Sequence, residues 1–343
     1  MYDSVGRLAS QSWIVGNSNF SESYSYNDGE NANGSLSKMT TATGDSLNYT
    51  YDTLQRLKNV ATKSSSGTTR FTTAYAYKTE ADGKTTPLVE YRNVRIGTSD
   101  TILEGKKYAY DAVGNITGIY ESQLVGNNTE RRQLVAYQYD EQNQLLSETY
   151  YTYSGTSTTP ATTNVYSYTY DTVGNILTEK KNGTTTKTYT YSTGDWKDLL
   201  TKFKGFSISY DGAGNPYYYP RVQSNTSYNM TWSEGRLLTY LDYATTASNE
   251  VQIRYQYDAD GIRTKKSIEQ YGATTTYSYI TQNGKVVRET IGSGTSAKVL
   301  DFIYDESGKP FALKYSTNGG SSFGTYYYVL NLQGDVVHML ISF

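Results

Sequence analysis

The stretch Tyr108-Ala109-Tyr110-Asp111-Ala112-Val113-Gly114-Asn115-Ile116 decides the fold that the sequence predicts. Its two tyrosines are two residues apart, so on a β-strand they point to the same face, where we expect them to stack on tyrosines of neighbouring strands. Asp111 is suited to open a turn, because its carboxylate can accept a hydrogen bond from the backbone N–H two residues on. Gly114 is suited to the left-handed conformation that closes a type I turn with a bulge. The stretch therefore predicts a β-hairpin, with Ile116 at the start of the returning strand.

The same unit recurs along the whole chain. Eight copies keep the Tyr-Asp pair, at Asp-to-Asp spacings of 29 to 59 residues. They are Tyr2-Asp3, Tyr51-Asp52, Tyr110-Asp111, Tyr139-Asp140, Tyr170-Asp171, Tyr210-Asp211, Tyr257-Asp258 and Tyr304-Asp305, with glycines in the repeat at Gly114, Gly174, Gly214, Gly261 and Gly308. A ninth copy at Trp232 is one residue short, and Tyr26-Asn27 is a degenerate copy. Because the unit is fixed and the spacing varies, a solenoid with one coil per repeat is excluded, and we assign these residues a structural role.

Further Tyr-x-Tyr pairs and two Asn-Gly pairs stand between these units. The tyrosine pairs end at Tyr26, Tyr77, Tyr153, Tyr191, Tyr279 and Tyr328, and the Asn-Gly pairs are Asn182-Gly183 and Asn283-Gly284. Asn-Gly between alternating strands is the sharpest signal of a two-residue hairpin. We therefore expect a second set of hairpins that alternates with the Tyr-Asp set.

The composition agrees with a nearly all-β chain. The 343 residues include 38 Tyr and 30 Gly, and only 36% are hydrophobic. Residues that favour strands and turns dominate, and tyrosine supplies a large apolar body whose hydroxyl can face water. We expect a continuous curved sheet of hairpins, wetted on its faces and without a conventional buried core.

Charge, cysteine content and hydropathy exclude several classes of protein. The 31 basic and 33 acidic residues give a net charge of -2, which supplies no field for a nucleic-acid partner. The absence of cysteine excludes disulfides, thiolate nucleophiles and cysteine-ligated metals. No stretch approaches the roughly 18 apolar residues of a membrane-spanning helix, and the first residues do not form a signal peptide.

Candidate catalytic and metal-binding groups are few. His338 is the only histidine, and its apolar surroundings predict a strand residue with no Ser and Asp placed beside it. Asp258-Ala259-Asp260-Gly261 resembles the start of a calcium loop, but Ile262 replaces an oxygen ligand and Arg263 replaces the required glycine. A glycosidase pair is disfavoured because its turn already explains each repeated aspartate. Asn318-Gly319-Gly320 lacks the lysine of a phosphate loop. We predict no catalytic residue, no cofactor and no metal site.

The repeated unit resembles the YD repeat of bacterial Rhs and wall-associated proteins, of the C component of insecticidal toxin complexes, and of animal teneurins. The resemblance covers residues 1–343 as a single array, and the stretch 326–343 is similar to the start of an Rhs repeat-associated core. It implies a hollow shell, a strip of hairpins spiralling around a cavity that in bacterial members holds a C-terminal toxin. It also implies a secreted or cell-surface parent protein, with the remaining shell and the toxin as partners.

The chain departs from that family pattern at both ends. Met1 directly precedes the first unit, and the core's cleavage motif and a toxin are missing after Phe343. Self-cleavage and toxin activity are therefore not carried over to any residue. We expect a fragment that forms an open strip, whose free strand edges favour self-association.

Three classes of function compete at this stage. The leading hypothesis is a non-catalytic wall section of a toxin-enclosing shell, used in toxin delivery between competing bacteria. The alternative is a surface module in which rows of tyrosine bind carbohydrate or cell wall. An enzyme on a β scaffold, the third class, would show converging carboxylates with perturbed pKa values.

Overall fold

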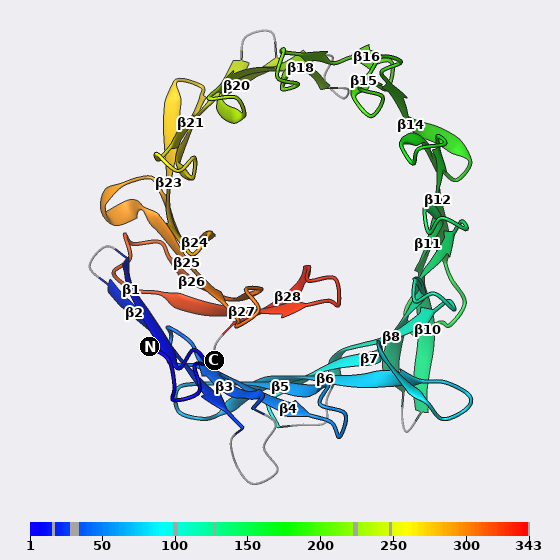
Figure 1. Ribbon diagram of the computed structural model, residues 1–343, viewed down its shortest axis with the longest axis vertical. Coiled ribbons are helices and arrows are strands. Elements are labelled where there is room, and N and C mark those ends of the chain that lie inside the picture. The colour runs from blue at the N-terminus through cyan, green and yellow to red at the C-terminus, as the bar shows by residue number, and fades with distance from the viewer. Residues whose placement is uncertain are drawn as a thin grey trace.

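The chain folds into a long meander of antiparallel strands that curls into a ring (Figure 1). The computed structural model describes residues 1–15, 18–27, 34–98, 102–125, 128–221, 226–246 and 249–341. A sheet of sixteen strands is followed by a sheet of twelve, and strands are neighbours in the order in which they occur in the sequence. The described residues contain no α-helix, and their only helical segment is the 3-10 turn η1 (Gly294–Ser296). The prediction of a nearly all-β array of hairpins is confirmed.

The strands of the first sheet are β1 (Ser10–Val15), β2 (Ser18–Tyr26), β3 (Leu36–Thr40), β4 (Ser46–Tyr51), β5 (Leu57–Lys63), β6 (Thr69–Thr79), β7 (Thr85–Ile96), β8 (Ile102–Tyr110), β9 (Ile116–Val125), β10 (Asn128–Tyr139), β11 (Leu145–Thr152), β12 (Thr162–Tyr170), β13 (Ile176–Lys181), β14 (Thr184–Tyr191), β15 (Leu200–Phe203) and β16 (Phe206–Ser207). Ile208 alone separates this sheet from the second.

The strands of the second sheet are β17 (Ser209–Tyr210), β18 (Pro216–Arg221), β19 (Thr226–Ser233), β20 (Leu237–Thr246), β21 (Asn249–Tyr257), β22 (Arg263–Gln270), β23 (Ala273–Gln282), β24 (Lys285–Ile291), β25 (Lys298–Tyr304), β26 (Pro310–Ser316), β27 (Gly324–Leu330) and β28 (Val336–Ile341). His338 lies in strand β28, as the sequence predicts, and its side chain is exposed.

Successive turns alternate between two rims of the strip, because paired strands are antiparallel and β17 continues in the direction of β16. We call the rim that carries the Tyr-Asp turns the YD rim. Asn182-Gly183 joins β13 to β14 at the opposite rim, as expected. Asn283-Gly284 joins β23 to β24 at the YD rim, so its assignment to the alternate set is wrong. The tyrosine pairs ending at Tyr26, Tyr77 and Tyr191 also stand at the YD rim.

The ring is completed where the two ends of the strip overlap, a region that we call the seam. Neither sheet closes by hydrogen bonds, since β1 and β28 remain edge strands. Instead, strands β25 to β27 lie along the inner side of β3 to β6 (Figure 1), and buried side chains from both ends form one apolar cluster. The open strand order agrees with the expected open strip. The overlap of the two ends was not expected from the sequence. It arises because the curvature adds up over 28 strands and brings the two ends face to face.

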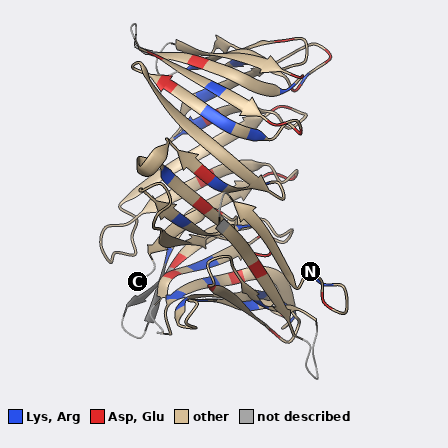
Figure 2. Cartoon of the chain, turned by 90° about the vertical axis from the view of Figure 1, so that its left-hand side faces the viewer, with Lys and Arg blue, Asp and Glu red and all other residues tan. Residues whose placement is uncertain are grey.

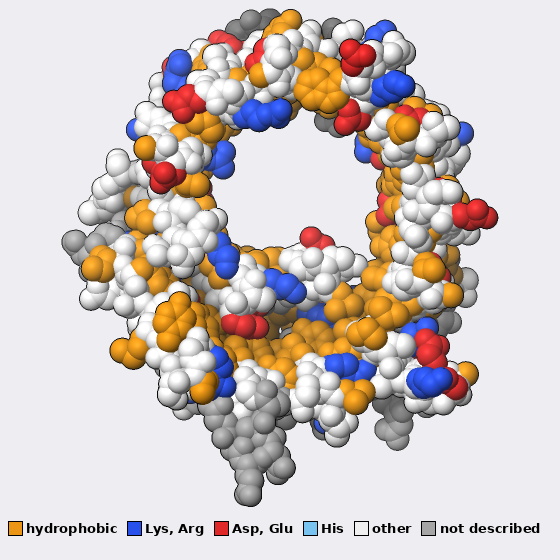
Figure 3. All heavy atoms as spheres, in the orientation of Figure 1, with side chains coloured by type: hydrophobic (Ala, Val, Ile, Leu, Met, Phe, Trp, Pro, Cys, Tyr) orange, Lys and Arg blue, Asp and Glu red, His pale blue; other side chains and the backbone are white. Residues whose placement is uncertain are grey.

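A real hydrophobic core therefore exists, at the seam. It consists of Met39, Leu47, Tyr49, Phe71 and Val94 from the N-terminal strands and Ile303, Phe311, Ala312, Tyr327 and Val329 from the C-terminal strands. The expectation that the chain lacks a buried core is wrong for this region. Elsewhere the wall is one sheet thick around an open middle (Figure 3). Basic and acidic side chains are interspersed along the side that Figure 2 faces.

Candidate functional site

Each Tyr-Asp turn is built around its aspartate. In all eight units, Oδ1 of the aspartate accepts from the backbone N–H two residues on and from the one four residues on, at 2.8–3.0 Å. The first of these bonds was expected from sequence, and the second was not. Asp258 is used in this way, in agreement with the rejection of a calcium loop. The aspartates of the repeat thus act as turn caps.

The backbone of the turn is also uniform. In the Tyr110-Asp111 unit, Asp111 N–H donates to the Asn115 carbonyl at 3.0 Å, and the strand register shifts just before the turn, as in a bulge. Gly114 adopts φ +95°, in the left-handed region. Where the sequence has no glycine at this position, Gln55 (φ 65°) and Asn143 (φ 62°) take the same conformation.

The pKa values of several turn aspartates lie below the ordinary value for aspartate. In Asp171 and Asp211 the side-chain hydrogen bond from the asparagine four residues on is the largest cause, helped by backbone N–H donors. In Asp52 partial desolvation opposes the shift, and hydrogen bonds and charge from Arg56 outweigh it. These hydrogen bonds favour the charged form, so the turns are strongest with ionised aspartates.

Tyrosine hydroxyls tie each hairpin to the one before it. At the YD rim, the tyrosine that precedes a turn donates its hydroxyl to the backbone carbonyl near the start of the strand that follows the previous turn, over separations of 10 to 25 residues. The donors are Tyr26, Tyr51, Tyr77, Tyr110, Tyr139, Tyr170, Tyr191, Tyr210, Tyr257 and Tyr304. We call this series the tyrosine ladder.

The ladder corrects the expectation that these hydroxyls face water. Tyr210 spans the break between the two sheets, donating to the Leu200 carbonyl at 2.6 Å. Trp232 takes the tyrosine's place in the ninth unit, where its indole N–H donates to the Pro216 carbonyl at 2.8 Å. Arginine at the fourth position after the aspartate adds a cation–π contact, as with Arg56 over the Tyr77 ring at 4.1 Å.

Removing one hydroxyl of the tyrosine ladder should lower the free energy of unfolding. We expect Tyr110→Phe to lose about 0.5–1.5 kcal/mol of stability, because the hydroxyl bond to the Val89 carbonyl disappears and that carbonyl loses its donor. Urea unfolding followed by circular dichroism measures the change. Tyr2→Phe is the matched control, since the Tyr2 ring is 70% exposed and should leave the midpoint unchanged. Equal midpoints for both variants would contradict a stabilising ladder.

The face that carries the ladder is the inner wall of the ring. Tyr49 and Tyr51 lie on one face of β4, and Tyr49 donates its hydroxyl to Glu306 of the C-terminal strands, which run inside the N-terminal ones (Figure 1). Since the first sheet is continuous, the equivalent tyrosines of the other units lie on this same face. The inner wall also carries Glu148, which accepts from the hydroxyls of Tyr150 (2.8 Å) and Tyr168.

Polar contacts reinforce the seam. Tyr327 donates its hydroxyl to Asp45 Oδ2 at 2.5 Å, and its ring packs edge-on against Phe71 and Phe311. Arg288 forms a bidentate ion pair with the buried Asp301 at 2.5 and 2.8 Å. Its remaining nitrogen donates to the backbone carbonyl at the end of β1, at 3.4 Å. The seam therefore combines an apolar cluster with hydrogen-bonded carboxylates from both ends.

Burial raises the pKa values of two carboxylates at the seam, Glu306 and Glu22. Desolvation raises the pKa of Glu306 above its ordinary value of 4.5, despite the hydrogen bond from Tyr49. Desolvation likewise raises the pKa of Glu22, although Gln11 and Tyr24 donate to it. Both groups are thus easier to protonate in the folded protein than in the unfolded chain.

Stability should consequently pass through a maximum on the acidic side of neutrality. Between pH 4.5 and the raised pKa values of Glu306 and Glu22, the folded state binds more protons, so stability falls as the pH rises. Below pH 3.8 the turn aspartates, whose pKa values are lowered, are still ionised in the fold, so stability falls as the pH drops through those values. Thermal melts at stepped pH test this. Glu306→Gln should flatten the profile above pH 4.5, and an unchanged profile would contradict the assignment.

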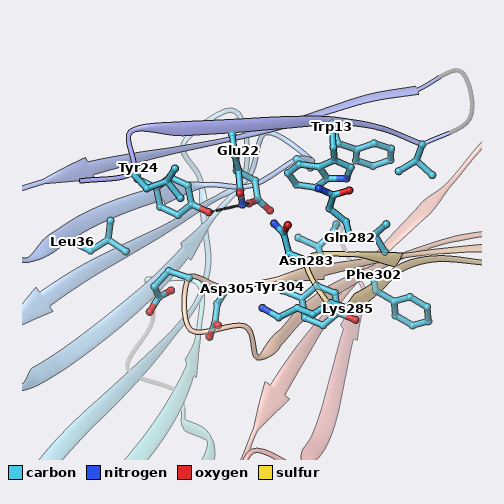
Figure 4. A pocket seen from close by; sticks show the side chains of 18 of the residues that line it. Trp13, Glu22, Tyr24, Leu36, Gln282, Asn283, Lys285, Phe302, Tyr304 and Asp305 are labelled. Carbon is cyan, nitrogen blue, oxygen red and sulfur yellow. Dashed lines mark hydrogen bonds between the residues drawn. The ribbon is translucent and has the colours of Figure 1, made fainter. Parts of the chain in front are cut away.

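A cavity of about 440 Å³ lies within the seam, between β1 to β3 and the β23–β25 region. Trp13, Phe20, Glu22 and Tyr24 form one wall, and Asn283, Lys285, Phe302 and Tyr304 form the other, so that Glu22 and Asn283 point into the same space from opposite sides (Figure 4). Nothing in the sequence indicated this cavity, because its walls are about 260 residues apart in the chain.

Two other kinds of site are absent from the part of the chain that the structure describes. It contains no group of three or more His, Cys, Asp or Glu side chains placed to hold a metal ion. It also contains no helix with the length and apolarity needed to cross a membrane.

Comparisons with known proteins extend these observations. No protein-family model matches the sequence. Over 203 residues, or 58% of this chain, the sequence is 32% identical to the tRNA3(Ser)-specific nuclease WapA of Bacillus spizizenii, and the match covers 7% of WapA. The chain thus spans a small part of the length of that relative.

Solved structures of toxin complexes share the fold over nearly the whole chain. A crystal structure of TcdB2-TccC3-Cdc42 gives a TM-score of 0.62 at 16% identity, covering 99% of this chain and 19% of that one. TcdB2-TccC3 without its hypervariable C-terminal region gives 0.54 at 18% identity, with the same coverage of 99% and 19%. A Photorhabdus luminescens Tc holotoxin pore gives 0.53 at 18% identity, covering 98% and 18%. The repeat, the hairpin geometry and these likenesses confirm the resemblance to the YD-repeat, or Rhs-repeat, proteins, and the chain shares the fold of the toxin-complex structures.

Proposed function

We propose that this chain is a non-catalytic section of the wall of a toxin-enclosing shell. The observation that carries the proposal is the inward tyrosine ladder, which uses the repeated tyrosines and aspartates to hold a curved wall, one sheet thick, around an open middle (Figure 3). Residues committed to a ladder and to turn caps are not available for chemistry. The shared fold with toxin-complex structures supports the same role.

The parent protein would supply the partners. By analogy with the toxin complexes, these are the rest of the shell and a toxin segment enclosed by it, and the parent would be secreted or bound at the cell surface. The inner wall suits the enclosure of a polypeptide because tyrosine rings, hydroxyls and paired charges alternate on it without a large single-sign field.

The absence of catalysis is tested with RNA, because the relative of similar sequence is a tRNA nuclease. We expect bulk tRNA to remain intact after prolonged incubation with the purified chain, with a commercial ribonuclease as the positive control. Cleavage that copurifies with the chain and survives repeated chromatography would overturn the non-catalytic role.

Enclosure is tested on the full parent protein. Trypsin should cleave the segment that follows this wall only after the parent is denatured, because the shell excludes the protease. The same segment expressed alone is the control and should be cleaved at once. Equal cleavage rates in the native and denatured parent would contradict an enclosing wall. Carbohydrate or cell-wall binding, the alternative from sequence, stays a prediction that a glycan array can test.

A further inference from the structure

We propose that the seam cavity binds an organic cation, an ammonium or guanidinium group carried on an apolar body, with Glu22 as its counter-ion. The cavity's 440 Å³ lies within the range of about 300–1,000 Å³ that small-molecule sites occupy. Its position between the two ends of the strip means that an occupant contacts both. The inference does not depend on the shell role.

Glu22 provides the first argument. The residue is only 7% exposed, yet it belongs to the cavity wall. Its Oε2 accepts both from Gln11 Nε2 at 2.7 Å and from the Tyr24 hydroxyl at 3.0 Å. No group of the described residues donates to its Oε1. Glu22 points into the cavity, so a ligand that brings an N–H donor and a positive charge would pair with this oxygen.

Aromatic rings around Glu22 provide the second argument. Phe20 and Tyr24 flank Glu22 on the same face of β2, and Trp13 pairs with Phe20 across the strands. The Trp13 and Phe20 rings are parallel, with centroids 6.0 Å apart. Aromatic faces attract cations within about 6 Å, so a carboxylate among three rings favours a cation with an apolar body.

The balance of charge provides the third argument. The cavity is lined by three carboxylates, Glu22, Asp305 and Glu306, and by one ammonium, Lys285. Lys285 Nζ lies 5.2 Å from the Tyr304 ring centroid on the far wall, and its charge also acts on Glu22. The excess of negative charge disfavours an anion.

Two cationic side chains of the protein already lie over aromatic rings at the edges of the cavity. Arg288 lies over the Phe20 ring at 5.8 Å, and Lys285 lies over Tyr304. Asp305 is occupied by its own turn, where it accepts from Lys309 N–H at 2.8 Å, and Glu306 is occupied by Tyr49. Glu22 is the lining carboxylate that lies among the rings of Trp13, Phe20 and Tyr24.

Calorimetric titration of the chain at pH 7.5 tests the proposal with three matched probes. We expect 2-phenylethylamine to bind, 2-phenylethanol to bind more weakly, and 3-phenylpropanoate not to bind. A peptide arm, acetyl-Phe-Arg-amide, distinguishes the source of the cation: tighter binding than the free amine identifies a polypeptide partner, and weaker binding identifies a small amine. Equal affinity for the amine and the alcohol, or binding of neither cation, would overturn the proposal.

Three variants test whether the amine binds in the seam cavity. Glu22→Gln keeps acceptors for Gln11 and Tyr24 but removes the charge, so affinity for the amine should fall by about tenfold or more while the alcohol is unaffected. Glu148→Gln is the matched control, a carboxylate on the inner wall held by two tyrosine hydroxyls, and should change nothing. Lys285→Met removes the resident ammonium and should strengthen amine binding. An amine affinity that Glu22→Gln leaves unchanged would refute the assignment even if Lys285→Met fails to fold.

Discussion

Replacing Tyr327 with alanine is expected to open the ring at its seam while most of the strip stays folded. The Tyr327 side chain is only 1% exposed, and it joins the two ends through its contacts with Phe71 and with Asp45. Removing a buried aromatic costs about 3–5 kcal/mol, and an unpaired Asp45 adds about 1–3 kcal/mol. Since Tyr327 lies in the larger of the two apolar clusters that join the ends, the loss should fall on ring closure.

Small-angle scattering measures the opening as a larger radius of gyration, and far-ultraviolet circular dichroism shows that the strands persist. Tyr326→Ala is the control, because Tyr326 is the neighbouring tyrosine on the opposite face of β27 and lies outside the seam cluster. A Tyr327→Ala chain with an unchanged radius of gyration would show that the seam does not hold the ring.

Removing the carboxylate of Glu104 should destabilise the wall more than any turn variant. Arg92 is only 1% exposed, and its guanidinium donates to Glu104 at 2.9 Å, with Lys106 3.5 Å from the same carboxylate. A buried pair that loses one partner costs about 3–5 kcal/mol, because the remaining charge cannot reach water. Glu104→Ala should therefore lower the urea midpoint strongly.

The double variant Arg92→Met/Glu104→Leu isolates the cause. If the cost comes from an orphaned charge, the double variant should recover most of the lost stability, since an apolar pair of similar volume suits the same site. If both variants are equally unstable, shape and packing matter more than charge. The burial of Tyr108 beside this pair raises its pKa to about 12, so its ring remains neutral throughout the measurement.

The local part of the fold could be predicted from sequence because its causes are local. Asp111 and Gly114 carry the turn by themselves, and the same chemistry works wherever the unit recurs. The spacing of the two tyrosines likewise gave the shared face. The role of the tyrosine hydroxyl was missed because its acceptor is a backbone carbonyl, such as that of Val89, which any residue could supply.

The seam and its cavity could not be predicted because they depend on accumulated geometry. The two cavity walls, which carry Trp13 and Lys285, face each other only because small twists between many neighbouring strands add up. No sequence pattern predicts that total twist. The pair of Arg92 and Glu104 has only a weak sequence signal, two opposite charges within two predicted strands. Asn283-Gly284 lies at the YD rim because one further turn, at Tyr271-Gly272 between β22 and β23, separates it from the Asp258 turn.

The tyrosine ladder has a direction, and that direction bears on how the protein is made. Every hydroxyl of the ladder reaches back to a carbonyl 10 to 25 residues earlier in the chain. On a ribosome the acceptor has therefore already been synthesised when its donor emerges, and each new hairpin can attach at once to the growing edge. Such a wall can be assembled from its first unit onward without waiting for later sequence.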